Sequence, residues 1–163
     1  MAKRTKSDDI KTNVMRLLEQ AKIPYKHHCY ADTDAISGME VACALNENPE
    51  QCFKTLVTVG KSGEHYVFVI PVTGELDLKK AAGAAGEKSI EMLKSKDLLP
   101  LTGYIHGGCS PIGMKKQFKT FIHESCNNFD TIFFSAGKIG YQVEVSPSDL
   151  RKILLFDIID LLF

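Results

Sequence analysis

Two runs of β-favouring residues joined by a short glycine-containing turn constrain the fold of this chain more than any other feature. Residues 53–59 and 65–70 are rich in β-branched and aromatic side chains, and Gly60-Lys-Ser-Gly63 separates them. This pattern is typical of a β-hairpin, because glycine adopts the backbone conformations that tight turns need. We therefore expect these two runs to form a pair of antiparallel strands.

Helix and strand signals continue on both sides of the hairpin. Helices are predicted from Ser7-Asp8-Asp9 to Pro24, at 39–45, from the cap Asp77 through 78–85, near 92–99 as far as Pro100, and from Ser146-Pro147 through Ile158. Further strands are predicted at 25–30, 103–106, 120–123, 131–135 and 141–145. Hairpins mixed with helical crossovers favour an α+β fold, a mixed β-sheet flanked by short helices, over a doubly wound parallel sheet. No linker or repeat divides residues 1–163, so we expect a single domain.

Charge and cysteine usage exclude several classes of protein. Lysine plus arginine (20) equals aspartate plus glutamate (20), which argues against a uniformly basic DNA-binding surface but leaves room for a local basic patch. No stretch approaches the roughly 20 apolar residues that span a bilayer, and the basic N-terminus lacks the apolar segment of a signal peptide. We expect a cytoplasmic protein with no membrane partner. Five cysteines without a C-x-x-C pair predict free thiols and no metal site.

Lys54 is a cation near the beginning of an otherwise apolar strand. Its side chain could simply extend to solvent along its aliphatic stem. Alternatively, the sheet could fix it so that it holds a phosphate or a carbonyl oxygen. The local pattern does not decide between these interpretations.

A glycine-rich segment over residues 103–113 is the second candidate. Four glycines and a proline would let backbone amides approach a ligand closely, although a purely structural turn is equally compatible with them. Lys115, Lys116 and Lys119 follow the segment and would place cations beside a bound nucleic-acid end. The turn from Ser135 to Gly140 would by itself be read as a hairpin.

Histidines and cysteines offer weaker signals. His27 and His28 would point to opposite faces of a strand, so they cannot both bind one ion. Cys52 and Cys109 lie in the two candidate segments, and a catalytic cysteine–histidine pair stays open as an alternative.

Four segments together resemble the YbaK/EbsC family, which is related to the inserted editing domain of bacterial prolyl-tRNA synthetases. They occur in the family's order and spacing across residues 14–155, and they are Phe53-Lys54-Thr55-Leu56, Gly74 to Lys80, Gly103 to Lys116, and Ser135-Ala136-Gly137-Lys138. The resemblance implies the editing-domain fold and the release of wrongly attached amino acids from tRNA. It implies no metal and no cofactor.

The resemblance also implies roles for individual residues. Lys54 would be the catalytic residue, and Gly107 to Pro111 would match the family's G-x-x-x-P loop. The residues that would bind the substrate are Tyr30, Thr55, Gly107, Gly108, Ser110, Pro111, Ser135 and Gly137. This sequence departs from the cysteine-specific members in two places: the loop between Tyr30 and Glu40 is shorter and lacks a pocket aromatic, and Gln142 stands where they carry an acidic residue.

The function implied by the resemblance is trans-editing of Cys-tRNA(Pro), either as a hydrolase or as a lyase that forms a thiolactone. The substrate's own thiol would attack its ester, while Lys54 holds a phosphate or polarises the ester and the Gly107 and Gly108 amides face the carbonyl oxygen. Alternatives are an Ala- or Ser-tRNA(Pro) deacylase that activates water, a non-catalytic tRNA-binding adaptor, and a hydrolase that uses a cysteine thiol. The expected partners are mischarged proline tRNA and prolyl-tRNA synthetase, which would supply tRNA selectivity to a chain with no net charge.

Overall fold

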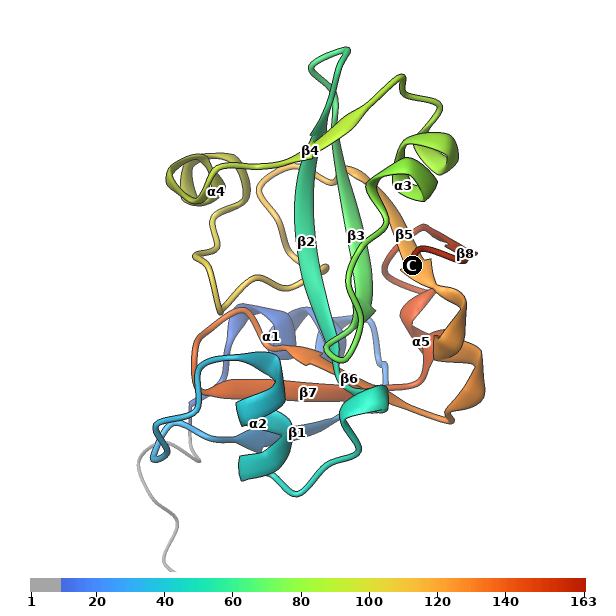
Figure 1. The fold of residues 1–163 in the computed structure, drawn as a ribbon. Coiled ribbons are helices and arrows are strands. Elements are labelled where there is room, and N and C mark those ends of the chain that lie inside the picture. The colour runs from blue at the N-terminus through green and yellow to red at the C-terminus, as the bar shows by residue number, and fades with distance from the viewer. Residues whose placement is uncertain (1–9) are drawn as a thin grey trace, which may run out of the picture.

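The computed structural model describes residues 10–163, in which short helices alternate with strands (Figure 1). The α-helices are α1 (Asn13–Gln20), α2 (Gly38–Ala44), α3 (Leu78–Ala85), α4 (Ser95–Thr102) and α5 (Pro147–Leu150), with 3-10 turns η2 (Pro49–Gln51) and η3 (Glu124–Asn128). The strands are β1 (Lys26–Cys29), β2 (Phe53–Gly60), β3 (His65–Pro71), β4 (Ile90–Met92), β5 (Lys119–His123), β6 (Ile132–Ser135), β7 (Tyr141–Val145) and β8 (Phe156–Ile159). None of the helices among these residues is both long enough and apolar enough to cross a membrane.

The predicted hairpin is confirmed and forms the middle of a five-stranded sheet. β2 and β3 pair antiparallel along their whole length, from Phe53 opposite Pro71 to Val59 opposite His65. β5 and β8 extend the sheet in parallel on the β3 side, which gives the order β4-β2-β3-β5-β8. On the other side β4 pairs with β2 only at Thr58–Gly60, so most of that edge of β2 has no neighbouring strand.

A second sheet lies across the end of the hairpin where one mixed sheet was expected. β1, β7 and β6 form an antiparallel three-stranded sheet, whose strands run across the direction of β2 and β3 in Figure 1. The two sheets meet where Cys52, just before β2, forms a parallel bridge with Phe133 of β6. The α+β class is confirmed, and the junction brings the beginning of β2 next to β6 and β7.

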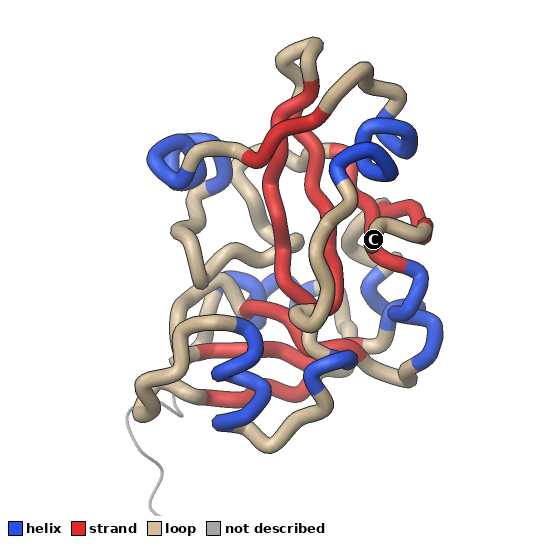
Figure 2. The backbone as a smooth tube through the Cα atoms, viewed as in Figure 1, coloured by secondary structure: helices blue, strands red, loops and turns tan. Residues whose placement is uncertain are grey.

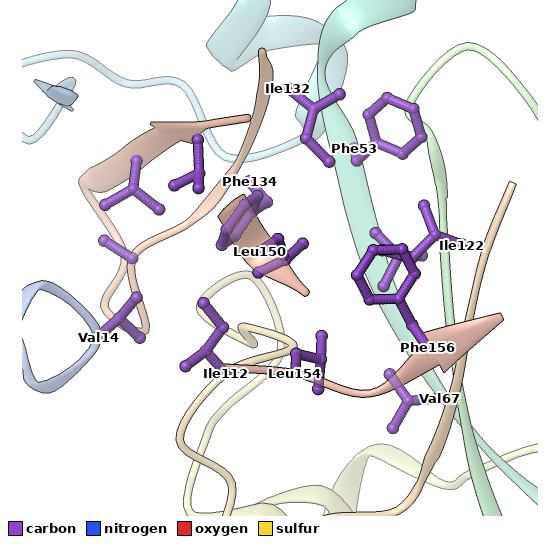
Figure 3. Close-up of a cluster of buried hydrophobic side chains, with 14 of the residues drawn as sticks. Val14, Phe53, Val67, Ile112, Ile122, Ile132, Phe134, Leu150, Leu154 and Phe156 are labelled. Carbon is purple, nitrogen blue, oxygen red and sulfur yellow. The ribbon is translucent and has the colours of Figure 1, made fainter. Parts of the chain in front are cut away.

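The main hydrophobic core fills the space between the two sheets. Figure 3 shows it built from side chains that are distant in sequence, with Val14 of α1, Phe134 of β6 and Leu150 of α5 among them. These three side chains are at most 1% exposed, so their transfer from water favours the folded state. A smaller core covers the other face of the five-stranded sheet, where Phe68 and Ile70 pack with α3.

Two ends of helices differ from the prediction. α1 begins at Asn13, and the Thr12 hydroxyl oxygen accepts a hydrogen bond from the Met15 N–H (3.3 Å); the predicted start at Ser7-Asp8-Asp9 lies outside the described residues. α4 begins later than predicted and continues past Pro100, and it ends where Gly103 adopts a left-handed conformation (φ 86°). Residues 103–106 therefore form a loop and not the predicted strand.

The predicted closing helix is wrong beyond its first turn. α5 ends at Leu150, and residues 156–159 form β8, which pairs in parallel with β5. Apolar residues at helical spacing suggested a longer helix, but backbone pairing along the open edge of β5 prevails over that local pattern.

Candidate functional site

A cavity of about 480 Å³ lies where the two sheets meet. Its walls come from the beginning of β2, the loop before α2, the segment from β4 to α4, the loop after α4, and the facing ends of β6 and β7. Figure 2 shows the long loop after α4 running between that helix and the three-stranded sheet. The volume is in the range of sites that enclose small molecules, about 300–1,000 Å³.

The cavity brings together several of the predicted site residues. Tyr30, Lys54, Thr55, Gly107 and Ser135 line it, although they come from four separate stretches of the chain. Residues 52–57 all contribute to the wall, because β4 does not extend along this part of β2. No ion pair within residues 10–163 includes Lys54, so its ammonium group is available to an anionic ligand.

The remaining predicted residues lie behind the cavity wall and shape the loop. Ser110 is fully buried, and its hydroxyl oxygen accepts a hydrogen bond from the Ile112 N–H (3.4 Å). Pro111 is also buried and does not line the cavity. The Gly108 N–H donates to the carbonyl oxygen of Ile105 (3.0 Å). That amide, one of the two expected to face the ester carbonyl, is therefore already paired with a carbonyl oxygen of its own loop.

Gly137 fixes the turn between β6 and β7 instead of lining the cavity. Its φ of 88° suits glycine, and a Cβ placed there would lie 2.9 Å from Cε1 of Tyr104. The Gly137 N–H donates to the hydroxyl oxygen of Ser135 (3.1 Å), and the Ser135 side chain reaches the cavity. The turn thus orients Ser135 and packs against the loop after α4.

The two cysteines of the cavity wall are poor nucleophiles. Burial raises the pKa of Cys52 to about 12, and the nearby Glu47 carboxylate adds to the shift. Burial also raises the pKa of Cys109 to about 12. The Cys52 thiol donates to the Glu47 carboxylate (3.5 Å) and to the Asn48 carbonyl oxygen (3.4 Å), not to a histidine. Both thiols are protonated near neutral pH, whereas a nucleophilic cysteine must be a thiolate.

Gln142 lines the cavity, although no role was expected for it. It lies opposite Ser135 on the neighbouring strand, is 5% exposed, and carries a buried amide oxygen with no hydrogen-bond partner among the described residues. Burial raises the pKa of the adjacent Glu47 carboxyl, and the nearby Gln142 side chain opposes that shift. The only sequence signal was the replacement of an acidic residue by Gln142.

The loop before α2 also contributes to the wall. Ile36 lines the cavity and is 68% exposed. Ser95 and Leu98 of α4 complete the opposite side. Their contribution depends on how α4 packs across the sheet, which the local sequence pattern does not reveal.

Comparison with known proteins gives a consistent result. The model of the family described as "Aminoacyl-tRNA editing domain" matches residues 24–153. EbsC of Enterococcus faecalis, named as a Cys-tRNA(Pro)/Cys-tRNA(Cys) deacylase, is 51% identical over 144 residues, which are 88% of each chain. YwhH of Bacillus subtilis is 24% identical over 121 residues, covering 74% of this chain and 76% of YwhH.

Solved structures share the fold at lower sequence identity. A protein described as a trans-editing enzyme for prolyl-tRNA synthetase has a TM-score of 0.80 and 24% identity, over 92% of this chain and 94% of that one. The protein APE2540 has a TM-score of 0.81 and 18% identity, over 91% of this chain and 97% of that one. These similarities concern the architecture of the two sheets and their helices.

Proposed function

The chain belongs to the aminoacyl-tRNA editing domain family, and on this basis we propose that it is a free-standing deacylase that clears cysteine from mischarged proline tRNA. The observation that carries the proposal is the 51% identity, over 88% of both chains, to a protein named for this activity. The cavity supports it, because it has the size of a small-molecule site and is lined by Lys54, which has no ion pair within residues 10–163.

The reaction we propose uses the substrate's own thiol as the nucleophile. The cysteinyl sulfur attacks the ester carbonyl carbon, a carbon–sulfur bond forms, and the bond from that carbon to the ribose oxygen breaks. The proton that the thiol loses ends on the departing ribose oxygen, so the products are a cyclic thiolactone and intact tRNA. A thiol tethered beside its carbonyl gains from intramolecularity, and the high pKa of Cys52 and Cys109 agrees with a protein that supplies no nucleophile.

In this proposal the protein contributes position and charge. Lys54 lies on the cavity wall, where its ammonium would hold a phosphate of the terminal adenosine or offset negative charge at the ester. The net charge of zero would give the protein little selectivity among tRNAs, so prolyl-tRNA synthetase is proposed as the partner that supplies it.

Deacylation of matched substrates tests the proposal. Purified protein should release cysteine from Cys-tRNA(Pro) far faster than it releases alanine, serine or proline from the same tRNA, and thiolactone should be detected as the first product. Equal clearance of Ala-tRNA(Pro) or Ser-tRNA(Pro) would instead indicate an activated water. Tight tRNA binding with no turnover of any substrate would indicate an adaptor. Adding prolyl-tRNA synthetase should increase selectivity for proline tRNA, and an unchanged selectivity would remove that partner from the proposal.

A further inference from the structure

The outer edge of β2 contains a gap in its backbone pairing that centres on Thr55. The Val72 N–H donates to the Cys52 carbonyl oxygen and the Gly60 N–H donates to the Glu64 carbonyl oxygen (both 2.8 Å), so even-numbered residues of β2 point their backbone groups toward β3. Odd-numbered residues point the other way, because the groups alternate along an antiparallel strand. The Leu93 N–H, which donates to the Val57 carbonyl oxygen (3.1 Å), confirms this direction.

Neighbouring segments close this gap at both ends. Phe133 pairs beside Cys52 at one end, and Leu93 bonds to Val57 at the other. Between them the N–H and carbonyl oxygen of Thr55 point to the open edge of β2, where Thr55 lines the cavity, and no backbone or side-chain group within residues 10–163 bonds to either. The Thr55 hydroxyl oxygen is also buried without a partner. Buried polar groups are normally paired, so the unpaired hydroxyl, next to two backbone groups without a described partner on the cavity wall, indicates a place for a ligand.

We propose that the aminoacyl group of the substrate fills this gap by pairing with the backbone of Thr55 as one residue of an antiparallel strand would. Two residues that face each other in such a pair exchange both of their backbone hydrogen bonds. An aminoacyl ester carries the matching groups on one α-carbon: an ammonium that donates to the Thr55 carbonyl oxygen, and a carbonyl oxygen that accepts from the Thr55 N–H. This inference rests on the proposed function and names how its substrate is held.

The pairing has a chemical consequence at the ester. When the thiol attacks, negative charge develops on the carbonyl oxygen, and a fixed N–H donor at that oxygen stabilises the transition state. Thr55 would thereby take the role expected of the Gly107 and Gly108 amides, of which the Gly108 N–H is bonded to Ile105. Because the contacts involve only groups common to all amino acids, discrimination would be left to the cavity walls and to the thiol.

Removing a single backbone N–H tests the inference. Incorporation of the α-hydroxy analogue of threonine at position 55 changes that amide to an ester and keeps the side chain. The kcat/KM of this ester variant for Cys-tRNA(Pro) should fall about 10²–10³-fold, as when one oxyanion-hole donor is removed. The thermal midpoint should fall only slightly, since no described group accepts this N–H and the change merely weakens the Lys54 carbonyl oxygen as an acceptor toward β3. The same change at Lys54 is the control, because the Lys54 N–H points toward β3. It should lower the thermal midpoint clearly, which shows that thermal unfolding detects the loss of a backbone hydrogen bond. Thr55→Val separates the effect of the hydroxyl.

Binding of an uncleavable probe keeps this inference distinct from the proposed function. Wild-type protein should bind 3′-cysteinylamino-3′-deoxyadenosine, and the ester at position 55 should weaken the Kd about tenfold, the equivalent of roughly 1.4 kcal/mol. The analogue without the α-amino group should bind wild-type protein about tenfold more weakly, because it lacks the donor to the Thr55 carbonyl oxygen. An unchanged Kd for the ester variant, equal binding of the two probes, or no binding of the first probe overturns the edge pairing. The two proposals can also fail separately. If the probe binds in a way that depends on position 55 but the protein does not deacylate Cys-tRNA(Pro), the pairing is upheld and the proposed function is overturned.

Discussion

The hydroxyl of Tyr104 donates a hydrogen bond to the carbonyl oxygen of Ile112, and the two oxygens are 2.6 Å apart. This bond closes the base of the loop whose residues 106, 107 and 109 line the cavity. Both residues are buried, at 8% and 3% exposure, so water cannot easily replace either partner. The contact holds one wall of the cavity in place.

Tyr104→Phe should therefore destabilise the protein. The change leaves the Ile112 carbonyl oxygen buried and unpaired, which typically costs about 1–3 kcal/mol in the free energy of unfolding. Urea unfolding would measure it. Tyr25→Phe is the matched control, because the Tyr25 hydroxyl bonds to Glu19 at an exposed position and its loss should cost less. Equal costs for the two variants would contradict the role given to Tyr104.

Lys54→Ala should lower the deacylation rate at least about a hundredfold, the size expected when a positioned charge is lost from a reacting centre. The fold should persist, since the Lys54 side chain has no ion pair within residues 10–163. Lys54→Arg should also be slow, because a planar guanidinium does not reproduce a compact ammonium. Single-turnover assays would measure both rates. Lys61→Ala, at the exposed tip of the hairpin, is the control and should behave as wild type; full activity of Lys54→Ala would remove Lys54 from the mechanism.

Replacement of Cys52 and Cys109 together by alanine should leave most of the activity. Burial raises the pKa of each thiol to about 12, so neither supplies a thiolate at neutral pH. S-methylcysteinyl-tRNA should persist, and the rate with Cys-tRNA should rise with pH until the substrate thiol, with an ordinary pKa of about 8.5, is ionised. Rates over pH 6–9 would show this. An inactive but folded double variant, or fast turnover of the S-methyl ester, would point to an enzyme nucleophile or to water.

Mild acidification should lower the free energy of unfolding because of His123. Burial lowers the pKa of His123, although the nearby carboxylates of Asp160 and Glu124 oppose the shift, and its Nδ1 accepts a hydrogen bond from the Leu161 N–H (3.1 Å). The folded state thus binds the proton less readily than the unfolded state. Its stabilising contribution is complete above the unfolded pKa of about 6.5 and is lost as the pH falls through the folded pKa.

His123→Asn tests this effect, because the asparagine oxygen can still accept from Leu161 but does not titrate. Between pH 7.5 and 5.5 wild type should lose more unfolding free energy than the variant does. The carboxyl groups of Asp160 and Glu144 have lowered pKa values in the folded protein, so they titrate at a lower pH than this range. Parallel losses in the two proteins would assign the acid sensitivity to other groups.

The sequence predicted the hairpin and α3 because their signals are local. Alternating β-branched residues define β2 and β3, and the Asp77 carboxylate bonds to the N–H groups of Lys79 and Lys80 as a helix cap should. Residues 103–106 and 156–159 were misassigned because their state is decided by distant partners. Tyr104 is held by Ile112 in a loop, and Phe156 pairs with Thr120 of β5.

The candidate site, like the fold, could be predicted from the sequence only in part. Of the residues that the resemblance assigned to the site, Lys54, Thr55 and Ser135 line one cavity, and their chemical roles remain predictions. It did not separate these residues from Ser110 and Gly137, which lie behind the wall, because a motif records position in the chain and not direction in space. The gap at Thr55 depends on where β4 stops, and no pattern within β2 reveals that length.

The shortness of β4 also bears on whether the open edge of β2 could pair with another chain. An open sheet edge offers unpaired N–H and carbonyl groups on which a foreign strand can align, and this is how fibres grow. The opening at Thr55 is bounded by Phe133 and Leu93, so it offers too few consecutive residues for another chain to pair. β2 can thus keep backbone groups unpaired for a small ligand without becoming a template for aggregation.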